Sequence, residues 1–167
     1  MQAGIRLIFL SLIWFFGAAP VAGQPAEPAK IAPLIDRLES WLDSHSDLPR
    51  AAIGAKIRFA DAADFAQPGQ RSAAIGRHLR GAYEPETSTI SLIRPWQENR
   101  VQDQSVLLHE LVHHRQTGVH YYCPAAQELA AYKLQRAWLA TKGEQLDVNW
   151  VAVVLASSCA ARDVHPD

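Results

Sequence analysis

The stretch His109-Glu110-Leu111-Val112-His113 has the pattern HExxH, and the rest of the chain is interpreted around it. On an α-helix, residues four apart lie about 40° apart around the axis, so His109 and His113 point the same way, one turn apart. They can therefore hold one metal ion between them. Glu110 is offset by roughly 100° and can still reach a water on that ion. Zinc suits this pattern, because imidazole is a good zinc ligand and a tetrahedral ion keeps one position for water.

The apolar residues around the motif predict that this helix is buried. They project nearly all round the helix axis and are Val106, Leu107, Leu108, Leu111 and Val112. Two histidines in a buried helix need partners, since unpaired buried polar groups are costly. A shared metal ion supplies such a partner. Ordinary hydrogen bonds in a metal-free network are the alternative.

Residues 1–23 have the features of a secretory signal peptide. Arg6 and the amino terminus supply positive charge, residues 7–19 are an apolar run, and cleavage after Ala22 or Gly23 fits the small residues there. The run is shorter than the roughly twenty residues of an ordinary membrane span, although an uncleaved anchor is the alternative. We therefore predict an exported protein, periplasmic or secreted, with no stable membrane span after signal cleavage.

The remaining chain is expected to be a Pro-rich linker, residues 24–30, followed by a single domain, residues 31–167. Without residues 1–23 the chain has about 144 residues, with 15 basic and 17 acidic side chains. This length is sufficient for one hydrophobic core. The slightly negative net charge and the lack of a basic patch in the sequence argue against nucleic acid as a partner. The sequence gives no indication of the oligomeric state.

Cys123 and Cys159 are the two cysteines of the chain. Export favours a disulfide between them, and two buried free thiols are the alternative. A thiolate zinc site is disfavoured, because the spacing is long and no Cys-x-x-Cys motif is present.

Hydrophobic periodicity predicts a helix followed by three strands in the first part of the domain. Apolar residues recur at helical spacing in residues 32–45 and alternate with polar residues in the half-buried strand 53–60. A turn or short helical piece is expected over 61–69. Two further extended runs, 77–83 and 89–94, are joined by a polar connection of hairpin type.

Glycines mark the first strand of this hairpin. Gly76 and Gly81 weaken it and suggest a bulge.

Three helices are expected after the strands. The motif helix is predicted over residues 104–117, with Asp103 as its N-cap and Gly118 as its C-terminal stop. The order of elements predicts an α+β fold, in which a small antiparallel or mixed sheet packs on the motif helix and the further helices.

The last two helices have recognisable ends. Pro124 opens a helix that runs to about Lys142, with Gly143 beyond it. Asp147 or Asn149 caps a final short helix around residues 150–155.

A catalytic zinc site usually has three protein ligands and one open position, and the candidates for the third ligand are Glu128 and His120. Glu128 lies near the start of a helix on its largely apolar face, so its carboxylate needs compensation. A short loop joins this helix to the motif helix, so the two should pack antiparallel and bring Glu128 opposite the histidines. Compensation by the helix N-terminus or by a salt bridge is the alternative.

The other histidines near the motif fit less well. In the pattern HExxHxxGxxH, the glycine and the last histidine would fall at Gln116 and Val119, so His120 is out of register. We expect His120 in a loop near the site, or as a hydrogen-bond donor to the transition state. His114 turns away from the ligand face and is expected to be structural or to support the ligands.

The motif, the short loop and the segment Glu128-x-x-Ala131-Tyr132 together resemble the gluzincin pattern of the thermolysin-like zinc metallopeptidases. The segment from about residue 81 to residue 138 is also similar to small exported bacterial proteins known only as HExxH metallopeptidase domains of unknown function. This resemblance covers roughly the central third of the predicted mature chain.

The resemblance implies a minimal zincin-like metallopeptidase domain with one zinc ion per chain. His109, His113 and Glu128 would bind the zinc ion, and Glu110 would be the general base. The resemblance also implies an edge strand beside the cleft, matched by residues 91–94, which could pair with an extended peptide or protein substrate.

One departure from the family concerns the residue that binds the transition state. The larger gluzincins bring a Tyr or His from a C-terminal domain, and we expect no such domain in this chain. The candidates for the donor are therefore His120, Tyr121 and Tyr122, although both tyrosines could equally be core aromatics.

The sequence as a whole predicts a hydrolase, a zinc-dependent metallopeptidase that cleaves peptide bonds with a metal-activated water and a Glu general base. A nucleophile of Ser or Cys type is not indicated, since no Gly-x-Ser-x-Gly is present. One alternative is a non-catalytic exported domain that binds zinc or peptides. Another is a metal-free interaction protein.

Overall fold

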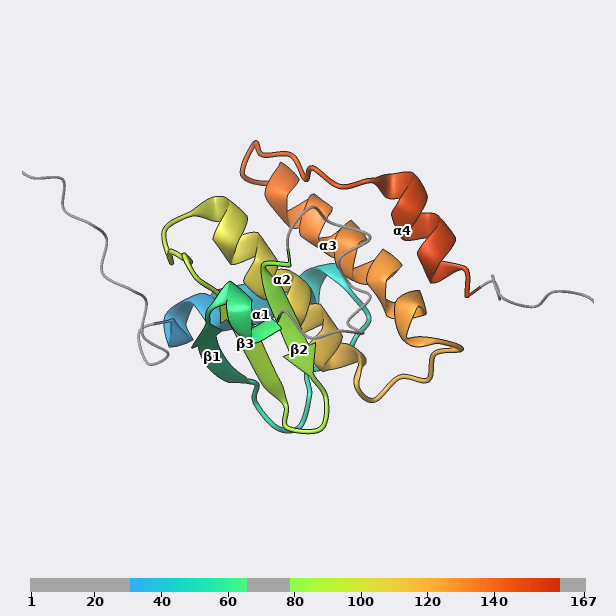
Figure 1. Ribbon diagram of the computed structural model, residues 1–167, viewed down its shortest axis with the longest axis horizontal. Helices are drawn as coiled ribbons and strands as arrows, with labels where there is room; N and C mark the ends of the chain where they lie inside the picture. The colour runs from blue at the N-terminus through green and yellow to red at the C-terminus, as the bar shows by residue number, and fades with distance from the viewer. Residues whose placement is uncertain (1–30, 66–78, 160–167) are drawn as a thin grey trace, which may run out of the picture.

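Four α-helices, two 3-10 helices and a three-stranded sheet form the part of the chain that the computed structural model describes, residues 31–65 and 79–159. The predicted α+β fold class is confirmed. Helix α2 (Val101–Gln116) lies between the sheet and helix α3 (Glu128–Ala140), and helix α4 (Trp150–Ser157) lies on the far side of α3 (Figure 1).

The sheet is mixed, with the strand order β1-β3-β2. Strand β1 (Lys56–Ala60) runs parallel to β3 (Thr89–Ile93), and β2 (Gly81–Glu84) runs antiparallel to β3, so the predicted hairpin is confirmed. The expected edge position of residues 91–94 is wrong, because β3 has a hydrogen-bonded neighbour on each side. The strand at the edge nearest α2 is β2.

The bulge expected at Gly81 is also wrong. Gly81 lies opposite Leu92 and Glu84 opposite Thr89, in an unbroken register. Gly76 falls outside the described residues, as do the predicted signal peptide and linker. Gly81 has a different role, which involves the motif helix.

One hydrophobic core joins helix α1 (Ala32–His45) to α2 and the sheet. Helix α1 buries Leu34, Leu38 and Leu42, which follow one another at a spacing of one turn. These residues belong to a cluster of fully buried side chains from β3, α2 and α3, including Ile90, Leu92, Leu107, Leu108, Leu111, Val112, Ala131 and Leu139. The predicted burial of the motif helix is therefore confirmed.

The start of α2 differs from the expectation. The helix begins at Val101, so Asp103 lies inside its first turn and does not act as the N-cap. The buried Asp103 carboxylate accepts a hydrogen bond of 2.6 Å from Arg80 Nη2 and one of 2.9 Å from the backbone N–H of Gln97. Both donors lie outside the helix. The Asp103 carboxylate therefore binds them, whereas the local sequence pattern had predicted that it caps the helix.

The later helix ends agree with the sequence. Pro124 opens the 3-10 helix η4 (Pro124–Gln127), which leads directly into α3. The side chain of Asn149 caps α4 by accepting a hydrogen bond of 3.1 Å from the backbone N–H of Ala152. Gly143 follows α3 with a φ of 73°, a left-handed conformation that glycine adopts without strain.

A buried ion pair fixes α2 against α1. The Arg115 side chain is fully buried and donates hydrogen bonds to Glu39, to Asp43 and to the backbone oxygen of Leu48. Hydrogen bonds from Arg50 and Arg115 lower the pKa of Asp43 to about 2. Because Arg115 lies two residues after the motif, this network helps to hold the motif helix in place.

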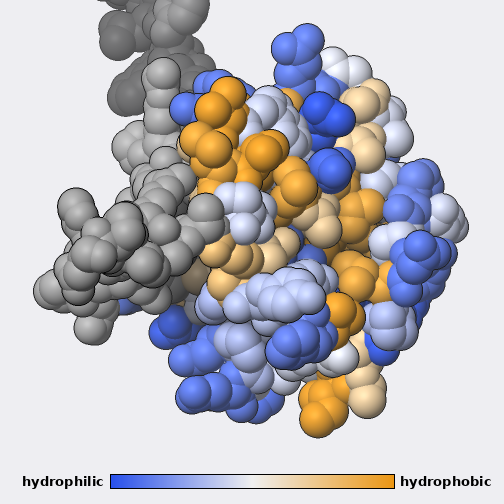
Figure 2. Space-filling view, turned by 90° about the vertical axis from the view of Figure 1, so that its right-hand side faces the viewer, coloured by the Kyte–Doolittle hydropathy of each residue, from blue (hydrophilic) through white to orange (hydrophobic). Residues whose placement is uncertain are grey.

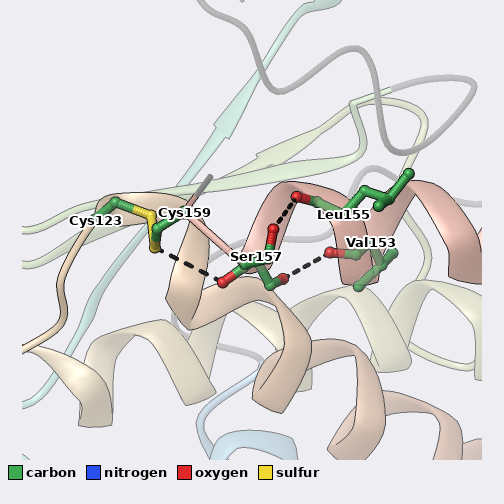
Figure 3. The surroundings of a disulfide bond; sticks show 6 residues. Cys123, Val153, Leu155, Ser157 and Cys159 are labelled. Carbon is green, nitrogen blue, oxygen red and sulfur yellow. Dashed lines mark hydrogen bonds between the residues drawn. A yellow bond between two sulfur atoms is a disulfide. The ribbon is translucent and has the colours of Figure 1, made fainter. Parts of the chain in front are cut away.

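A disulfide joins Cys123, just before η4, to Cys159, just after α4 (Figure 3). The predicted pairing is confirmed. The bond joins residues 36 positions apart in the sequence, and their Cα atoms are 5.9 Å apart. It ties the last helix to the segment from which α3 begins.

Helix α4 has little burial of its own. It buries Val153 but leaves Val151, Val154 and Leu155 exposed by 68%, 50% and 53%. Figure 2 looks onto this end of the molecule, where hydrophobic residues reach the surface. In the described part of the chain, no helix is both long and apolar enough to cross a membrane.

We expect the double variant Cys123→Ser with Cys159→Ser to lose about 3–4 kcal/mol of unfolding free energy, the chain entropy that a cross-link of this length removes from the unfolded state. Because α4 buries little apolar surface, few other contacts hold it in place when the disulfide is absent. Guanidinium unfolding of the variant and of the wild type measures the loss. A difference below about 1 kcal/mol would contradict the structural role of the disulfide.

Candidate metal centre

Two helices bring the three candidate ligands together. His109 and His113 lie one turn apart on α2, and Glu128 is the first residue of α3. One ligand atom from each of the three residues lies within 4.8 Å of the other two. The two Nε2 atoms are 3.0 Å apart, and carboxylate oxygens of Glu128 lie 3.4 Å from His109 Nε2 and 3.6 Å from His113 Nε2.

The separations of 3.0, 3.4 and 3.6 Å, the last two to different oxygens of the Glu128 carboxylate, are close to those around a tetrahedral zinc ion. Zinc bonds of about 2.0–2.1 Å at tetrahedral angles place neighbouring ligand atoms roughly 3.3 Å apart. Two imidazole nitrogens and one carboxylate oxygen are also the protein ligands found in one class of catalytic zinc sites. The residues therefore fit a zinc ion, and three protein ligands leave one position for water or substrate.

The second nitrogen of each histidine has its own partner. His109 Nδ1 lies 3.0 Å from Gln135 Oε1, and His113 Nδ1 lies 2.9 Å from Gln116 Oε1. Both rings are thus held by hydrogen bonds at the edge that faces away from Glu128.

The charges in the cluster affect one another strongly. Burial would by itself raise the pKa of Glu128, but hydrogen bonds from His109 and His113 hold that pKa well below its usual range. Burial would lower the pKa of His113, but the hydrogen bond to Glu128 and the charge of Glu110 outweigh it and raise the pKa. Glu128 therefore stays ionised, the form in which a carboxylate binds a metal.

Glu110 is buried beside the ligands, between α2 and the edge strand β2. Burial raises the pKa of the Glu110 carboxyl, and Glu128 adds to this effect, while His109, His113 and the Tyr83 backbone N–H oppose it. The Tyr83 N–H donates a hydrogen bond to the Glu110 carboxylate. Glu110 is thus a carboxyl group with a raised pKa and a fixed position, as a proton-transferring group requires.

Gly81 makes room for Glu110. A Cβ atom at this position would lie 2.8 Å from Glu110 Oε1 and 2.8 Å from Val106 Cγ1. Only glycine lets the β2 backbone come this close to α2 without displacing one of these side chains.

We expect Gly81→Ala to displace the Glu110 carboxylate and to destabilise the fold by about 1–3 kcal/mol, the usual cost of overpacking. Zinc binding should change little, because the clash does not involve the three ligand residues. The melting temperature and the zinc affinity of the variant test both statements. Gly54→Ala is the matched control, since a Cβ at Gly54 would meet nothing within 4 Å. A variant as stable as this control would contradict the role of Gly81.

A tyrosine also belongs to this site. The Tyr132 ring, one turn after Glu128 on α3, packs edge-on against His109 with the ring centroids 4.5 Å apart. Burial and the charges of Glu128 and Glu110 raise the pKa of Tyr132 to about 12, so the phenol keeps its proton. A protonated hydroxyl can donate a hydrogen bond to a developing negative charge.

The remaining predicted residues lie elsewhere. His114 contacts the Tyr83 hydroxyl and the backbone oxygen of Ile53, at 3.1 and 2.8 Å, in keeping with a structural role. His120 and Tyr122 pack against each other in the loop between α2 and η4, and Tyr122 is 96% exposed. Tyr121, in the same loop, is half-buried. Among the described residues, His120 is not part of the cluster of possible metal ligands. The role of His120, Tyr121 or Tyr122 as a donor stays a prediction.

Comparison with known families gives one match. The model of a family described as a domain of unknown function (DUF6647) matches residues 27–167, most of the chain. The chain belongs to the DUF6647 family. No curated protein and no solved structure matches it. The family description assigns no chemistry, so the function has to be argued from the geometry of the site in this DUF6647 member.

Sequence reasoning missed Gln135, Gln116 and the supporting role of Gly81, and it named Tyr132 only as part of a motif. A signal was present for the glutamines. Gln135 lies on the same face of α3 as Glu128, two turns on, and Gln116 lies three residues after His113. Polar residues at these spacings from metal ligands are candidates for holding the ligands in place.

Proposed function

We propose that this protein is a zinc-dependent metallopeptidase of gluzincin type, with His109, His113 and Glu128 as zinc ligands and Glu110 as the general base. The observation that carries the proposal is the convergence of three ligand atoms from α2 and α3 beside a buried carboxyl group. The HExxH motif by itself is a weaker argument, since such short motifs occur by chance.

The proposed mechanism divides the chemistry among few groups. A zinc ion in this site would polarise the scissile carbonyl and lower the pKa of a bound water. Glu110 would accept a proton during the attack of water and pass it to the leaving amine. Tyr132, next to His109, is a candidate to donate a hydrogen bond to the oxyanion, a role for which the sequence had suggested His120, Tyr121 or Tyr122.

The proposed substrate is an extended peptide or a segment of a protein. Within residues 31–65 and 79–159, strand β2 pairs with β3 on one side only, and its backbone at Tyr83 reaches Glu110. A peptide that adds to the outer edge of β2 would pass close to the general base. The outer edge of β2 thus takes the substrate-binding role that the sequence had suggested for residues 91–94. Strand β3, to which most of those residues belong, already pairs with a strand on each side.

An oxidising compartment fits the proposal. The Cys123–Cys159 disulfide is typical of exported proteins. Together with the signal-like residues 1–23, it supports a periplasmic or secreted location.

The first test is the zinc content of the purified protein after dialysis against a weak chelator. We expect about one zinc ion per chain, and hydrolysis of a peptide library that stops with a strong chelator and returns with added zinc. One zinc ion without hydrolysis of any peptide would favour a non-catalytic zinc-binding domain. Folded protein that cannot be loaded with zinc would end the peptidase proposal and leave a metal-free interaction domain.

A further inference from the structure

We propose that Gln135 and Gln116 are positioning residues that fix the tautomers of His109 and His113, so that both Nε2 atoms present a lone pair to a metal ion. This inference rests on the proposed zinc site, but it concerns groups that need not touch the metal, the substrate or the reacting atoms. It follows from which atom has to be the donor and which the acceptor in each of a short series of hydrogen bonds.

The series at His109 begins with a serine hydroxyl. Ser105 Oγ has one proton and donates it to the backbone oxygen of Gln102 at 2.7 Å. Its lone pairs therefore accept the hydrogen bond of 3.1 Å from Gln135 Nε2. The other end of the amide, Oε1, then faces His109 Nδ1 at 3.0 Å. A carbonyl oxygen can only accept, so Nδ1 has to carry the proton.

The series at His113 is shorter and leads to the same result. Gln116 Nε2 donates to the backbone oxygen of Gln127 at 3.0 Å, and this carbonyl can only accept. Gln116 Oε1 consequently faces His113 Nδ1 at 2.9 Å, and this Nδ1 carries the proton as well. Gln116 is completely buried, so water does not compete for these bonds.

The consequence appears at the opposite edges of the two rings. A neutral imidazole with a proton on Nδ1 has a free lone pair on Nε2. The two Nε2 atoms lie 3.0 Å apart, and the Glu128 carboxylate completes a group of three electron-pair donors. In the metal-free protein a proton on Nε2 can bridge these groups, as the hydrogen bonds from the histidines to Glu128 require, and a metal ion would take the place of that proton. The glutamines thus keep the proton on Nδ1, so that the proton lost on metal binding is the one on Nε2.

Each glutamine is a neutral acceptor at a place where many metal sites have a carboxylate. Carboxylates often orient histidine ligands in metal sites. Here the carboxyl groups of Glu110 and Glu128 already lie beside the two rings. A divalent cation balances two carboxylates. A glutamine orients each ring without adding a third negative charge.

The test compares the zinc affinities of full-length variants by competition with a chelator of known affinity. Gln135→Met and Gln116→Met keep most of the side-chain volume but remove the acceptor, and each is expected to weaken zinc binding about 10- to 100-fold. Gln135→Glu restores an acceptor and is expected to bind zinc within threefold of the wild type. The exposed Gln145, changed to Met, is the matched control and should bind as the wild type does.

The order of the zinc affinities of the Met and Glu variants distinguishes a positioning role of Gln135 from a packing role. If Gln135 only filled space, the apolar Met would be tolerated better than the buried charge of Glu, and the order of affinities would be reversed. Histidine ring nitrogen NMR of the zinc-loaded wild type should show a proton on Nδ1 of both residues. Ser105→Ala, which frees the Gln135 amide, replaces Gln135→Met if the latter does not fold, and should also weaken zinc binding.

Two results would overturn the proposal, and they differ in their meaning. Wild-type zinc binding with Met variants within threefold of it, or a metal bound through Nδ1, would refute the role of the glutamines and leave the peptidase proposal intact. A folded wild type that binds no zinc would refute both.

Discussion

Glu110→Gln is expected to lower the rate of peptide hydrolysis by about 10²- to 10⁴-fold, the contribution of a general base. The amide has nearly the shape of the carboxylate, and its oxygen can still accept the hydrogen bond from the Tyr83 N–H. It cannot, however, take a proton from water at neutral pH. Zinc affinity should stay close to that of the wild type, since Glu110 is not one of the three converging residues.

Stability gives this variant a second, independent readout. The burial of Glu110 raises its pKa because the site disfavours the charge, and a neutral amide avoids that cost. The zinc-free variant should therefore melt no lower than the wild type. Measured together, a large loss of hydrolysis, unchanged zinc affinity and unchanged or higher melting temperature are the pattern of a proton-transferring group.

The matched control for this substitution is Glu86→Gln, an identical change at an exposed position between β2 and β3. It should leave the rate unchanged. If Glu110→Gln hydrolyses peptides as fast as this control, with contaminating peptidases excluded, Glu110 is not the base. If zinc is lost together with activity, Glu110 is instead a ligand or a structural support.

Local patterns were sufficient to predict the helices and the candidate ligands. HExxH positions two histidines on one helix face whatever the tertiary structure, and a short loop to the next helix leaves few ways to place Glu128. The burial of α2 also followed from apolar residues on all of its sides. These predictions depend only on helical geometry and on a short connection.

The order of the strands could not be derived in the same way. Strand β1 pairs in parallel with β3, across an intervening segment of more than twenty residues, and no local pattern specifies such a partner. The central position of β3 did have a signal, because Ile90, Leu92 and Ile93 give it apolar residues on both faces. The prediction that residues 91–94 form an edge strand came from the family resemblance. The apolar residues on both faces of β3 would instead have predicted a central strand.

The supporting contacts of the site were the hardest to predict, since each depends on atoms that are distant in the sequence. From the sequence, Asp103 is predicted to be an N-cap, but in the fold it binds Arg80. Gly81 is predicted to weaken its strand, but in the fold it makes room for Glu110. The role of Gln135 requires both Ser105 and His109 in place. Sequence spacing suggests such residues as candidates, and only the packing of α2 against α3 and β2 selects them.

Glu128→Ala is expected to weaken zinc binding on the order of 100-fold or more, because one of the three proposed protein ligands is lost from a site whose binding free energy they would share. Glu128 lies at the exposed end of the cluster, with its side chain 26% exposed, so its removal leaves only a small cavity. The zinc-free variant should remain folded. Zinc competition and a thermal melt of the same sample measure both properties.

His120→Ala tests the other candidate for the third ligand under the same conditions. It should change zinc affinity less than threefold, because His120 packs with Tyr122 in the loop, while Glu128 reaches both histidines of α2. The opposite result, loss of zinc in His120→Ala and retention in Glu128→Ala, would require the loop to move onto the site and would remove the gluzincin ligand set. Equal and small effects in both variants would mean that the two histidines bind zinc without a third ligand from either position. A difference of two orders of magnitude between the variants would therefore support Glu128 as the ligand and assign the start of α3 to the metal centre.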